Sequence, residues 1–439
     1  MKTQNPNRRS SPRAAWRNHL AATAALVLLL GIGVQARTWT SSDGTKTFEG
    51  ELKSYDPATG IVNVTQPNGK VMKFQQDKLS AADIEFLKDN GKAAAPAAGK
   101  PGTVKPGIDS SKLLERSDGK PADMAKPVQV FILLGQSNMV GLGKVNGGDG
   151  SLENAVKTKT KYPYLVEDDG KWVERKDVRN VQFMQGKGML KNEWMTVTGK
   201  TMGPEYGIGH PVGNAVEAPV MILKSCIGNR SLGWDLLPPG SERYEVVEKD
   251  KSGAEKTFIY AGYGDSPDKW EKGTEPKPIA WKAGIQYDGD VADAKKALAD
   301  LATHYPGATK FEVAGFFFWQ GEKDCGNASH AAKYEENLVR FIKSLRKDFN
   351  APNAKFVLGT LGESVKGSAG NGGLVLNAQL AVDGTSGKYS EFKGNVATIY
   401  TNPMAQGGSG NGHYGGKAEV YMDVGQAMGK AMVELLKSK

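Results

Sequence analysis

The stretch VQVFILLGQSNM, residues 128–139, decides the fold of this chain. It begins with a short apolar run from Val128 to Leu134, which is typical of a buried strand in a parallel sheet. In open parallel sheets the ligand crevice lies outside the carboxyl ends of the strands. Ser137 follows the run between two amide side chains, so the sequence predicts a serine placed for nucleophilic attack at that crevice.

Predicted strands and helices alternate along residues 127–439. Apolar residues recur at helical spacing from Val291 to Leu301, from Tyr334 to Leu345 and from Tyr421 to Leu435. This alternation predicts an α/β fold with a parallel sheet and helices on both faces. The segment 231–285, rich in Pro, Gly and Lys, is expected to form an insertion over the crevice. The five predicted strands are Val128–Leu134, Val220–Leu223, Val313–Phe318, Phe356–Thr360 and Val396–Tyr400.

Serine-dependent ester hydrolysis needs a nucleophile, a base, a group that orients the base, and donors for the oxyanion. Ser137 is the candidate nucleophile. Met139 stands where an α/β-hydrolase elbow has its second glycine, which argues against that fold. The alternative is that Ser137 only caps the turn that follows it.

The block Gly135-Gln136-Ser137-Asn138-Met139, the block Trp319-Gln320-Gly321-Glu322 and the late His413 resemble the SGNH hydrolases. The resemblance is to the sialate O-acetylesterase-like branch, also called carbohydrate esterase family six, and covers roughly residues 127–437. It implies a flavodoxin-like three-layer domain with a five-stranded parallel sheet. The implied function is a serine esterase that removes O-acetyl groups from oligo- or polysaccharides, either sialate- or acetylxylan-type, without cofactor or metal.

The resemblance gives the base role to His413, on a loop before the last helix, with His210 in a glycine-rich loop as the rival. The family often places an aspartate three residues before this histidine, where this chain has Gly410. Some relatives use the glutamate of the Trp-Gln-Gly-Glu block, so the resemblance implies Glu322 as third triad member, with Asp324 as substitute. A Ser–His dyad, with Glu322 only binding the nucleophile loop, is the open alternative.

The expected oxyanion donors are the backbone N–H of Ser137, a backbone donor at Gly228 and the side chain of Gln320. Gly228 is the one match to the family's Gly-Gly pair. The resulting candidate sites are catalytic Ser137, His413 and Glu322, oxyanion-binding Ser137, Gly228 and Gln320, and substrate-binding Gln136, Asn138 and Arg230.

The first 36 residues are typical of a secretory signal peptide. Five basic residues precede an apolar stretch from Leu20 to Val34, and Val34-Gln35-Ala36 offers a cleavage site. We expect an exported protein, periplasmic or extracellular, with a retained membrane anchor as the alternative. Cleavage after Ala36 lowers the formal charge from +9 to +4. Because no basic stripe with interleaved aromatic residues remains, the sequence argues against nucleic-acid binding.

Residues 37–90 are expected to form a small β domain. Ile61–Thr65 and Val71–Phe74 flank the turn sequence Pro67-Asn68-Gly69, and a short helix follows Ser80. This segment resembles the SH3-like barrel of the Sla-homology domain, which implies either binding to an envelope component or a passive spacer. Residues 91–126, rich in Ala, Pro, Gly and Lys, predict a flexible linker.

Two cysteines, Cys226 and Cys325, each follow a predicted strand. Export would permit a disulfide between them, but two free thiols are equally compatible with the sequence. Neither cysteine has metal-ligand spacing. Besides the esterase, the sequence leaves open a catalytically impaired carbohydrate-binding protein on the same fold and, less favoured, an exported lipase or thioesterase.

Overall fold

The computed structural model describes residues 37–56, 60–90, 108, 109, 111, 113–250, 252–406, 408, 410 and 412–438. The chain divides into two compact units, Met1–Lys100 and Pro101–Lys439. The predicted signal peptide, residues 1–36, lies outside the described residues, as does the first part of the predicted linker.

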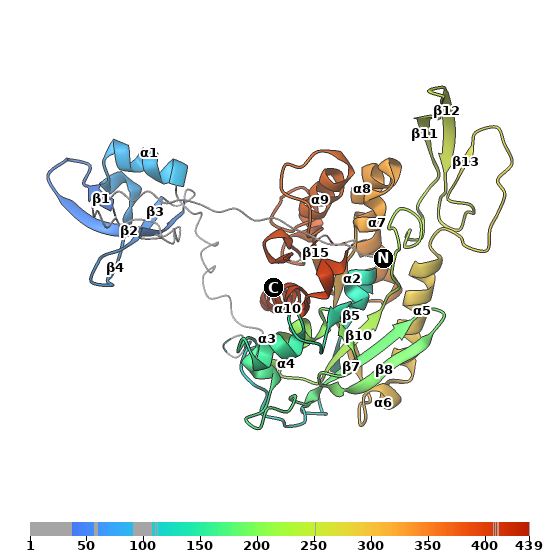
Figure 1. Ribbon diagram of the computed structural model, residues 1–439, viewed down its shortest axis with the longest axis horizontal. Coiled ribbons are helices and arrows are strands. Elements are labelled where there is room, and N and C mark those ends of the chain that lie inside the picture. The colour runs from blue at the N-terminus through green and yellow to red at the C-terminus, as the bar shows by residue number, and fades with distance from the viewer. Residues whose placement is uncertain are drawn as a thin grey trace, which may run out of the picture. The chain divides into compact units, whose positions relative to one another are not determined.

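A mostly parallel sheet forms the centre of the larger unit (Figure 1). Its strand order is β16-β15-β14-β5-β10-β7-β8, and only the edge strand β8 runs antiparallel to its neighbour. The strands are β5 (Val128–Gly135), β7 (Arg175–Met184), β8 (Gly188–Met195), β10 (Val220–Ser225), β14 (Phe311–Trp319), β15 (Lys355–Gly359) and β16 (Val396–Ile399).

All five predicted strands are confirmed, but the five-stranded prediction was wrong because the sheet also includes β7 and β8. β7 carries buried Arg175, Arg179 and Asn180, so it lacks the apolar run of a buried strand. Each of these residues is hydrogen-bonded; for example, Arg175 contacts Asp177 and the carbonyl of His210. β8 is an edge strand with little buried surface, and its sequence therefore gives no strong pattern.

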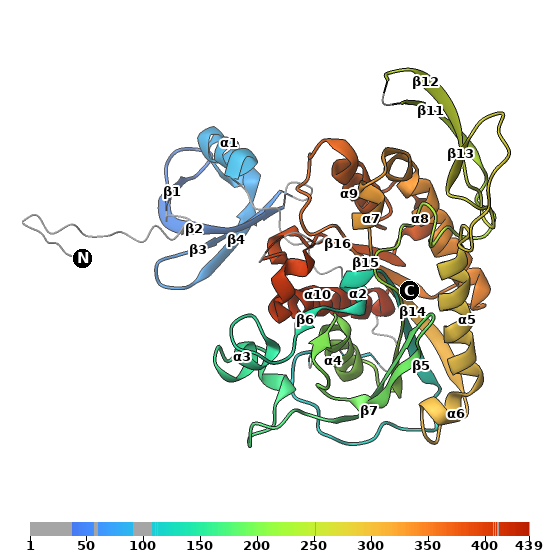
Figure 2. The same cartoon turned by 45° about the vertical axis from the view of Figure 1, so that its right-hand side comes forward.

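Helices cover both faces of the sheet, as the alternation of strands and helices predicted (Figures 1 and 2). On one face α5, α6, α8 and α9 pack against one hydrophobic core, and on the other face α3, α4 and α10 pack against a second. These helices are α3 (Leu152–Lys157), α4 (Glu205–Ala215), α5 (Ile285–Ala299), α6 (Leu301–His304), α8 (Ala328–Asp348), α9 (Gly370–Ala381) and α10 (Ala418–Lys437).

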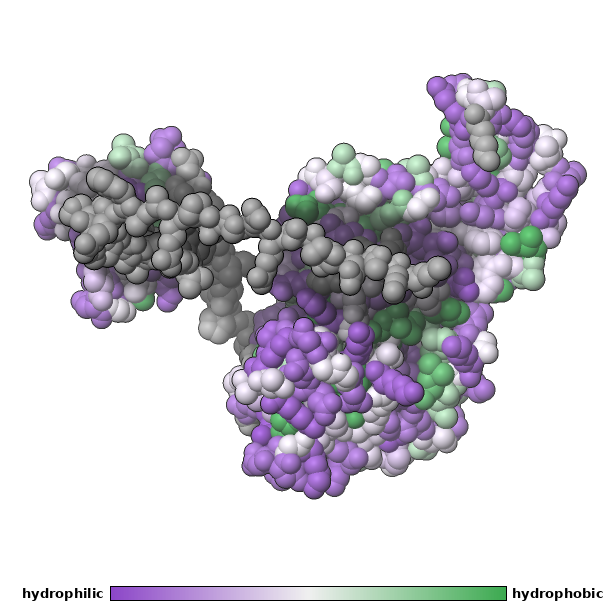
Figure 3. Space-filling view, viewed as in Figure 1, coloured by the Kyte–Doolittle hydropathy of each residue, from purple (hydrophilic) through white to green (hydrophobic). Residues whose placement is uncertain are grey.

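The predicted insertion contains a three-stranded antiparallel sheet that projects from the end of the unit near α7 and α8 (Figures 1 and 2). In the space-filling view this projection carries mostly hydrophilic or intermediate residues and only small hydrophobic groups (Figure 3). The smaller elements of this unit are β11 (Tyr244–Lys249), β12 (Glu255–Tyr260), β13 (Lys269–Glu271), the ribbon β6 (Gly143–Lys144) with β9 (Thr201–Met202), and the short helices α2 (Ser137–Val140) and α7 (Glu322–Cys325).

Within its described residues, the N-terminal unit contains a four-stranded antiparallel sheet of order β1-β2-β3-β4 and the helix α1. Trp39 lies at the centre of its small core, and Asp83 ties the helix to the first strand by accepting hydrogen bonds from Arg37 and the backbone of Thr40. The barrel itself stays a prediction. The elements are β1 (Arg37–Thr40), β2 (Thr47–Asp56), β3 (Ile61–Thr65), β4 (Val71–Gln75) and α1 (Ala81–Asn90).

The later part of the predicted linker packs on the larger unit. Ile108 forms a β-bridge with Val216, and the Lys126 ammonium donates to the carbonyl of Glu217. This part therefore belongs to the second unit, because its backbone and charged side chains find partners there. Of the helices within the described residues, none is long and apolar enough to cross a membrane.

Gly135 ends β5 at a φ of +149°, and a Cβ atom there would lie 2.3 Å from the backbone oxygen of Trp319. We expect Gly135→Ala to lower the free energy of unfolding by about 2–4 kcal/mol, since neither backbone can move freely. Gly147→Ala is the control, because its φ is +111° but a Cβ would meet nothing within 4 Å. Urea unfolding of both variants checks this; equal losses would contradict the role of the Trp319 contact.

Candidate active site

Ser137 is the first residue of α2, immediately after β5, and its side chain is partly exposed. The turn is closed by hydrogen bonds from the backbone N–H groups of Met139 and Val140 to the carbonyl of Gln136. Lys224, at the end of β10, donates to the carbonyl of Val140 at 2.8 Å and forms a buried ion pair with Glu205. Ser137 therefore lies at the carboxyl edge of the sheet, on a turn that the hydrogen bond from Lys224 holds in place.

The carboxylate of Glu322 binds both residues that flank Ser137. Its Oε2 accepts a hydrogen bond from Nε2 of Gln136, and its Oε1 accepts one from Nδ2 of Asn138 at 2.7 Å. The side chain is buried, and this burial, with the nearby charge of Glu363, raises the pKa of Glu322 to about 7. These contacts match the alternative in which Glu322 binds the nucleophile loop, residues 136–138. A role for Glu322 as the triad acid stays a prediction.

Gln136 and Asn138 both make structural hydrogen bonds, and the substrate contact predicted for them stays a prediction. Gln136 is 2 % exposed and Asn138 is fully buried. Besides binding Glu322, Gln136 Oε1 accepts from the backbone N–H of Arg230 at 3.3 Å. The two amides therefore join the loop after β5 to the loops after β14 and β10.

Gly228, on the loop after β10, lies directly beside Ser137. A Cβ atom at Gly228 would lie 3.4 Å from the Cβ of Ser137, which places this loop against the nucleophile candidate as the oxyanion prediction requires. Gln320 is held in a network. Its Nε2 donates to the carbonyl of Arg230 at 2.9 Å and to Asp324 at 2.5 Å. One of these bonds must be exchanged if Gln320 is to donate to an oxyanion.

Asp324 holds the loop that follows Gly228. Its carboxylate accepts hydrogen bonds from the backbone N–H groups of Leu232 and Gly233, at 2.9 and 2.8 Å. It is fully buried, and burial raises its pKa. Asp324 therefore fixes the pocket loop, and its role as substitute triad acid stays a prediction.

His413 begins a short turn immediately before α10, and its backbone lies at a φ of +51°. Its N–H donates to the carbonyl of Gly410 at 3.0 Å, and the same carbonyl accepts from Nδ2 of Asn138 at 3.3 Å. The Tyr421 hydroxyl lies within hydrogen-bond distance of both Asn138 Oδ1 and the His413 carbonyl. The structure thus brings the histidine turn to the nucleophile loop.

The Ser137 hydroxyl and the His413 imidazole do not form a hydrogen bond with each other among the described residues. Such bonds are often long before substrate binds. The rival His210 lies within helix α4, not in the loop that was expected. It is buried against Tyr164, and burial lowers its pKa well below the usual value.

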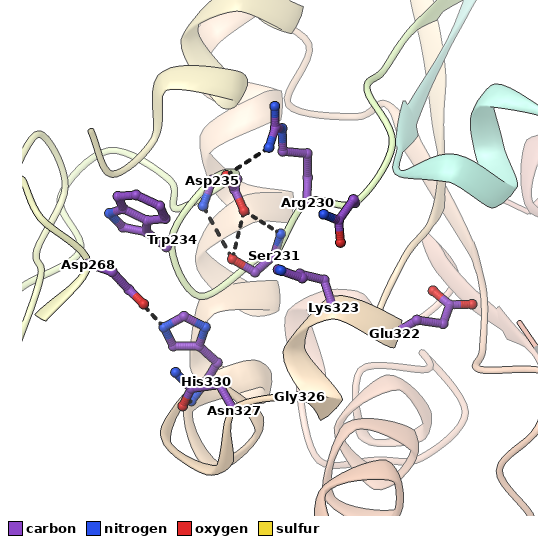
Figure 4. A pocket seen from close by; sticks show the side chains of 11 residues that line it. Arg230, Ser231, Trp234, Asp235, Asp268, Glu322, Lys323, Gly326, Asn327 and His330 are labelled. Atoms are coloured by element: carbon purple, nitrogen blue, oxygen red, sulfur yellow. Dashed lines mark hydrogen bonds and ion pairs between the residues drawn. The ribbon is translucent and has the colours of Figure 1, made fainter. Parts of the chain in front are cut away.

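A pocket of about 450 Å³ opens beside the site (Figure 4). Arg230 contributes to its wall, stacks its guanidinium on Trp281 at 4.2 Å and lies 3.8 Å from Asp235. In Figure 4, Trp234, Asp268 and His330 lie on one side and Glu322 on the other. The lining residues are Asn229, Arg230, Ser231, Trp234, Asp235, Asp268, Glu322, Lys323, Gly326, Asn327 and His330.

The insertion is attached to this pocket through a histidine. His330, at the start of α8, lies 3.1 Å from Asp268, and its ring packs on Tyr260. Burial opposes the charged ring, but the hydrogen bond and charge of Asp268 outweigh it and raise the pKa of His330. His330 therefore holds the insertion in place.

Sequence reasoning missed several residues of this region. Glu363 follows β15 by a few residues and accepts a hydrogen bond from the Gly410 N–H at 2.9 Å. Its position after a predicted strand was a usable signal. Trp281 and Asp268 lie in the insertion, where no periodic pattern marked them. Cys226 and Cys325 are both free thiols, and the described residues contain no cluster of metal-ligating side chains.

Part of the larger unit matches a known protein family. Residues 259–434 match the family described as carbohydrate esterase, sialic acid-specific acetylesterase. This match confirms the resemblance seen in the sequence, and it includes Gln320, Glu322 and His413 but begins after Ser137 and Gly228.

Similar solved structures include a protein from Arabidopsis thaliana, 17 % identical over 70 % of this chain and 98 % of that one, with a TM-score of 0.40. A carbohydrate acetylesterase from Xanthomonas citri is 13 % identical over 90 % of this chain and 68 % of its own, with a TM-score of 0.39. NanS is 13 % identical over 56 % of this chain and 69 % of its own, with a TM-score of 0.29. No curated protein matches this chain.

The raised pKa of Glu322 predicts a pH dependence of stability. Because this pKa is about 7 in the folded protein and 4.5 in the unfolded chain, its contribution is fully present below pH 4.5 and is lost as the pH rises through 7. The loss should reach at most about 3 kcal/mol. Glu322→Gln removes it, so the free energies of unfolding of wild type and variant, measured by urea between pH 4 and 8, should change differently. Parallel curves would contradict this.

Proposed function

We propose that this protein is a serine esterase that removes O-acetyl groups from carbohydrate. The family match over residues 259–434 supports carbohydrate acetylesterase activity. The observation that carries the mechanism is the hydrogen bonding of Glu322 to both neighbours of Ser137, since it joins the nucleophile loop to the Trp-Gln-Gly-Glu block.

In the proposed reaction, the Ser137 hydroxyl attacks the acetyl carbonyl carbon and His413 takes its proton. The backbone N–H groups of Ser137 and Gly228, with the amide of Gln320, would stabilise the oxyanion; loss of one such donor typically costs about 10²–10³ in rate. The tetrahedral intermediate collapses to acetyl-Ser137, and His413 returns the proton to the sugar oxygen. His413 then deprotonates a water molecule that attacks the acetyl carbon. The bond to the Ser137 oxygen breaks, acetate leaves, and His413 returns the proton to the Ser137 oxygen.

The pocket beside Glu322 is the proposed site for the sugar. Trp234 offers an aromatic wall, and Arg230 offers hydrogen-bond donors above Trp281. Lys323 also lines the pocket, and among the described residues it has no ion-pair partner, whereas Asp268 is paired with His330. The exposed ammonium of Lys323 is therefore available to a carboxylate of the sugar, which favours the sialate-type alternative of the two expected from the sequence.

Export to the periplasm or outside the cell is part of this proposal, because the first 36 residues have the pattern of a signal peptide. We also propose that the N-terminal unit binds an envelope component. A second candidate function is carbohydrate binding without catalysis, favoured by Gly410 at the position where the family often has an aspartate.

Replacement of the nucleophile separates the two functions. We expect Ser137→Ala to lower acetate release from 4-nitrophenyl acetate by roughly three or more decades, because the acetyl-enzyme cannot form. Ser252→Ala, in the exposed turn between β11 and β12, is the matched control and should keep wild-type activity. If wild type and Ser137→Ala are equally inactive but both bind glycans, the carbohydrate-binding function is correct instead.

The charge of the pocket predicts selectivity. We expect Lys323→Ala to raise KM about fivefold for an O-acetylated sialic acid, which corresponds to about 1 kcal/mol, and to leave KM for an acetylated xylo-oligosaccharide unchanged. Lys187→Ala, on the turn between β7 and β8, controls for net charge. An equal change in KM for both substrates would show that Lys323 does not bind the carboxylate of the sugar.

A further inference from the structure

Gly410 lies between two carboxylates. A Cβ atom at this position would lie 2.5 Å from Oε1 of Glu322 and 2.6 Å from Oε2 of Glu363. An aspartate side chain therefore does not fit here unless both glutamates move. The space beside the histidine turn already holds acidic groups, which come from the loops after β14 and β15.

Glu363 and its neighbour contact the histidine turn on both sides of His413. The carboxylate of Glu363 accepts from the N–H of Gly410 at 2.9 Å, three residues before the histidine. A Cβ atom at Gly362 would lie 2.5 Å from the hydroxyl oxygen of Tyr414, the residue after it. Asn402 fixes this loop by donating to the carbonyl of Gly362 at 2.8 Å. Glu363 is therefore held next to the turn that carries the imidazole.

The two carboxylates differ in the capacity that remains to them. Both oxygens of Glu322 accept side-chain hydrogen bonds from the nucleophile loop, and the group is buried. Glu363 is exposed, and within the part of the chain that the structure describes it accepts one hydrogen bond, from Gly410. A carboxylate can accept about four hydrogen bonds, so Glu363 has acceptor capacity left for an imidazole N–H.

We propose that Glu363 is the positioning residue of His413. Its carboxylate holds the histidine turn through Gly410 and stabilises the imidazolium that forms when His413 takes a proton. This inference rests on the proposed function, in which His413 is the base. It gives the orienting charge to Glu363, a residue that the sequence analysis did not name.

The charge of Glu363 acts on the groups around the histidine turn. Glu363 is close enough to Glu322 to raise its pKa, and it contributes to the raised pKa values of Tyr414 and Cys325. The other groups that face the turn are Tyr421 from α10 and Lys144, whose Cε would lie 3.1 Å from a Cβ at Gly416. The positive charge of Lys144 disfavours a protonated imidazole. Among the described residues beside this turn, Glu363 is therefore the carboxylate that can still accept a hydrogen bond from the ring.

The test compares Glu363→Gln and Glu363→Asp with Glu391→Gln, an exposed glutamate that pairs with Lys343. We expect Glu363→Gln to lower kcat/KM for 4-nitrophenyl acetate about tenfold or more. Its acidic pH limb should move to lower pH by about half a unit or more, since an imidazolium loses a negative neighbour. Glu363→Asp should keep most activity, and Glu391→Gln all of it. The imidazole nitrogen shifts of His413, measured by NMR on histidine-labelled protein and assigned with His413→Asn, should change in Glu363→Gln and stay unchanged in Glu391→Gln.

Wild-type rate and an unchanged acidic limb in Glu363→Gln would overturn the inference. A lower rate with an unchanged acidic limb and unchanged imidazole shifts of His413 would also overturn it, because Glu363 would then have only a structural effect. If wild type shows no Ser137-dependent hydrolysis, the proposed function fails, but the NMR comparison still decides whether Glu363 acts on His413. Circular dichroism confirms folding, and Glu363→Ala, which also removes the charge, serves if Glu363→Gln does not fold.

Discussion

The site depends on one buried carboxylate. Glu322 accepts hydrogen bonds from the amides on both sides of Ser137, and the second of these amides, Asn138, also binds the carbonyl of Gly410. Three segments far apart in sequence are therefore joined by one short chain of contacts. Burial makes ionised Glu322 costly, and the two amide donors partly offset that cost. The nucleophile loop and the histidine turn keep their relative position because this group connects them.

The parallel sheet and the insertion contribute differently to the site. The sheet brings the loops after β5, β10, β14 and β15 to one edge, because parallel strands end on the same side. The insertion supplies Trp281 and Asp268, and Asp268 is held by His330 on α8. Asp324 holds the start of the insertion by accepting hydrogen bonds from the backbone N–H groups of Leu232 and Gly233. The sheet thus places Ser137, Gly228 and Glu322 at one edge, and the insertion shapes the pocket beside them.

The sequence predicted the parts of the fold whose patterns are local. Apolar runs such as Val128–Leu134 marked five strands, and helical spacing marked α5, α8 and α10 but not α4 or α9. β7 was missed because Arg175 and Asn180 are buried with partners that no pattern shows. For the site, order along the chain was enough to select Ser137 and His413 as candidates. The structural task of Asn138 was not predictable, since its partner Glu322 lies 184 residues away.

The measurement that tests the central claim most directly is mass spectrometry of the protein quenched in acid during turnover of 4-nitrophenyl acetate. With an activated ester, acylation outpaces deacylation, so the intermediate accumulates. We predict one added acetyl group, on the peptide that contains Ser137. Turnover with no acetyl group at Ser137, or with a reactive acetyl group at another residue, would contradict it.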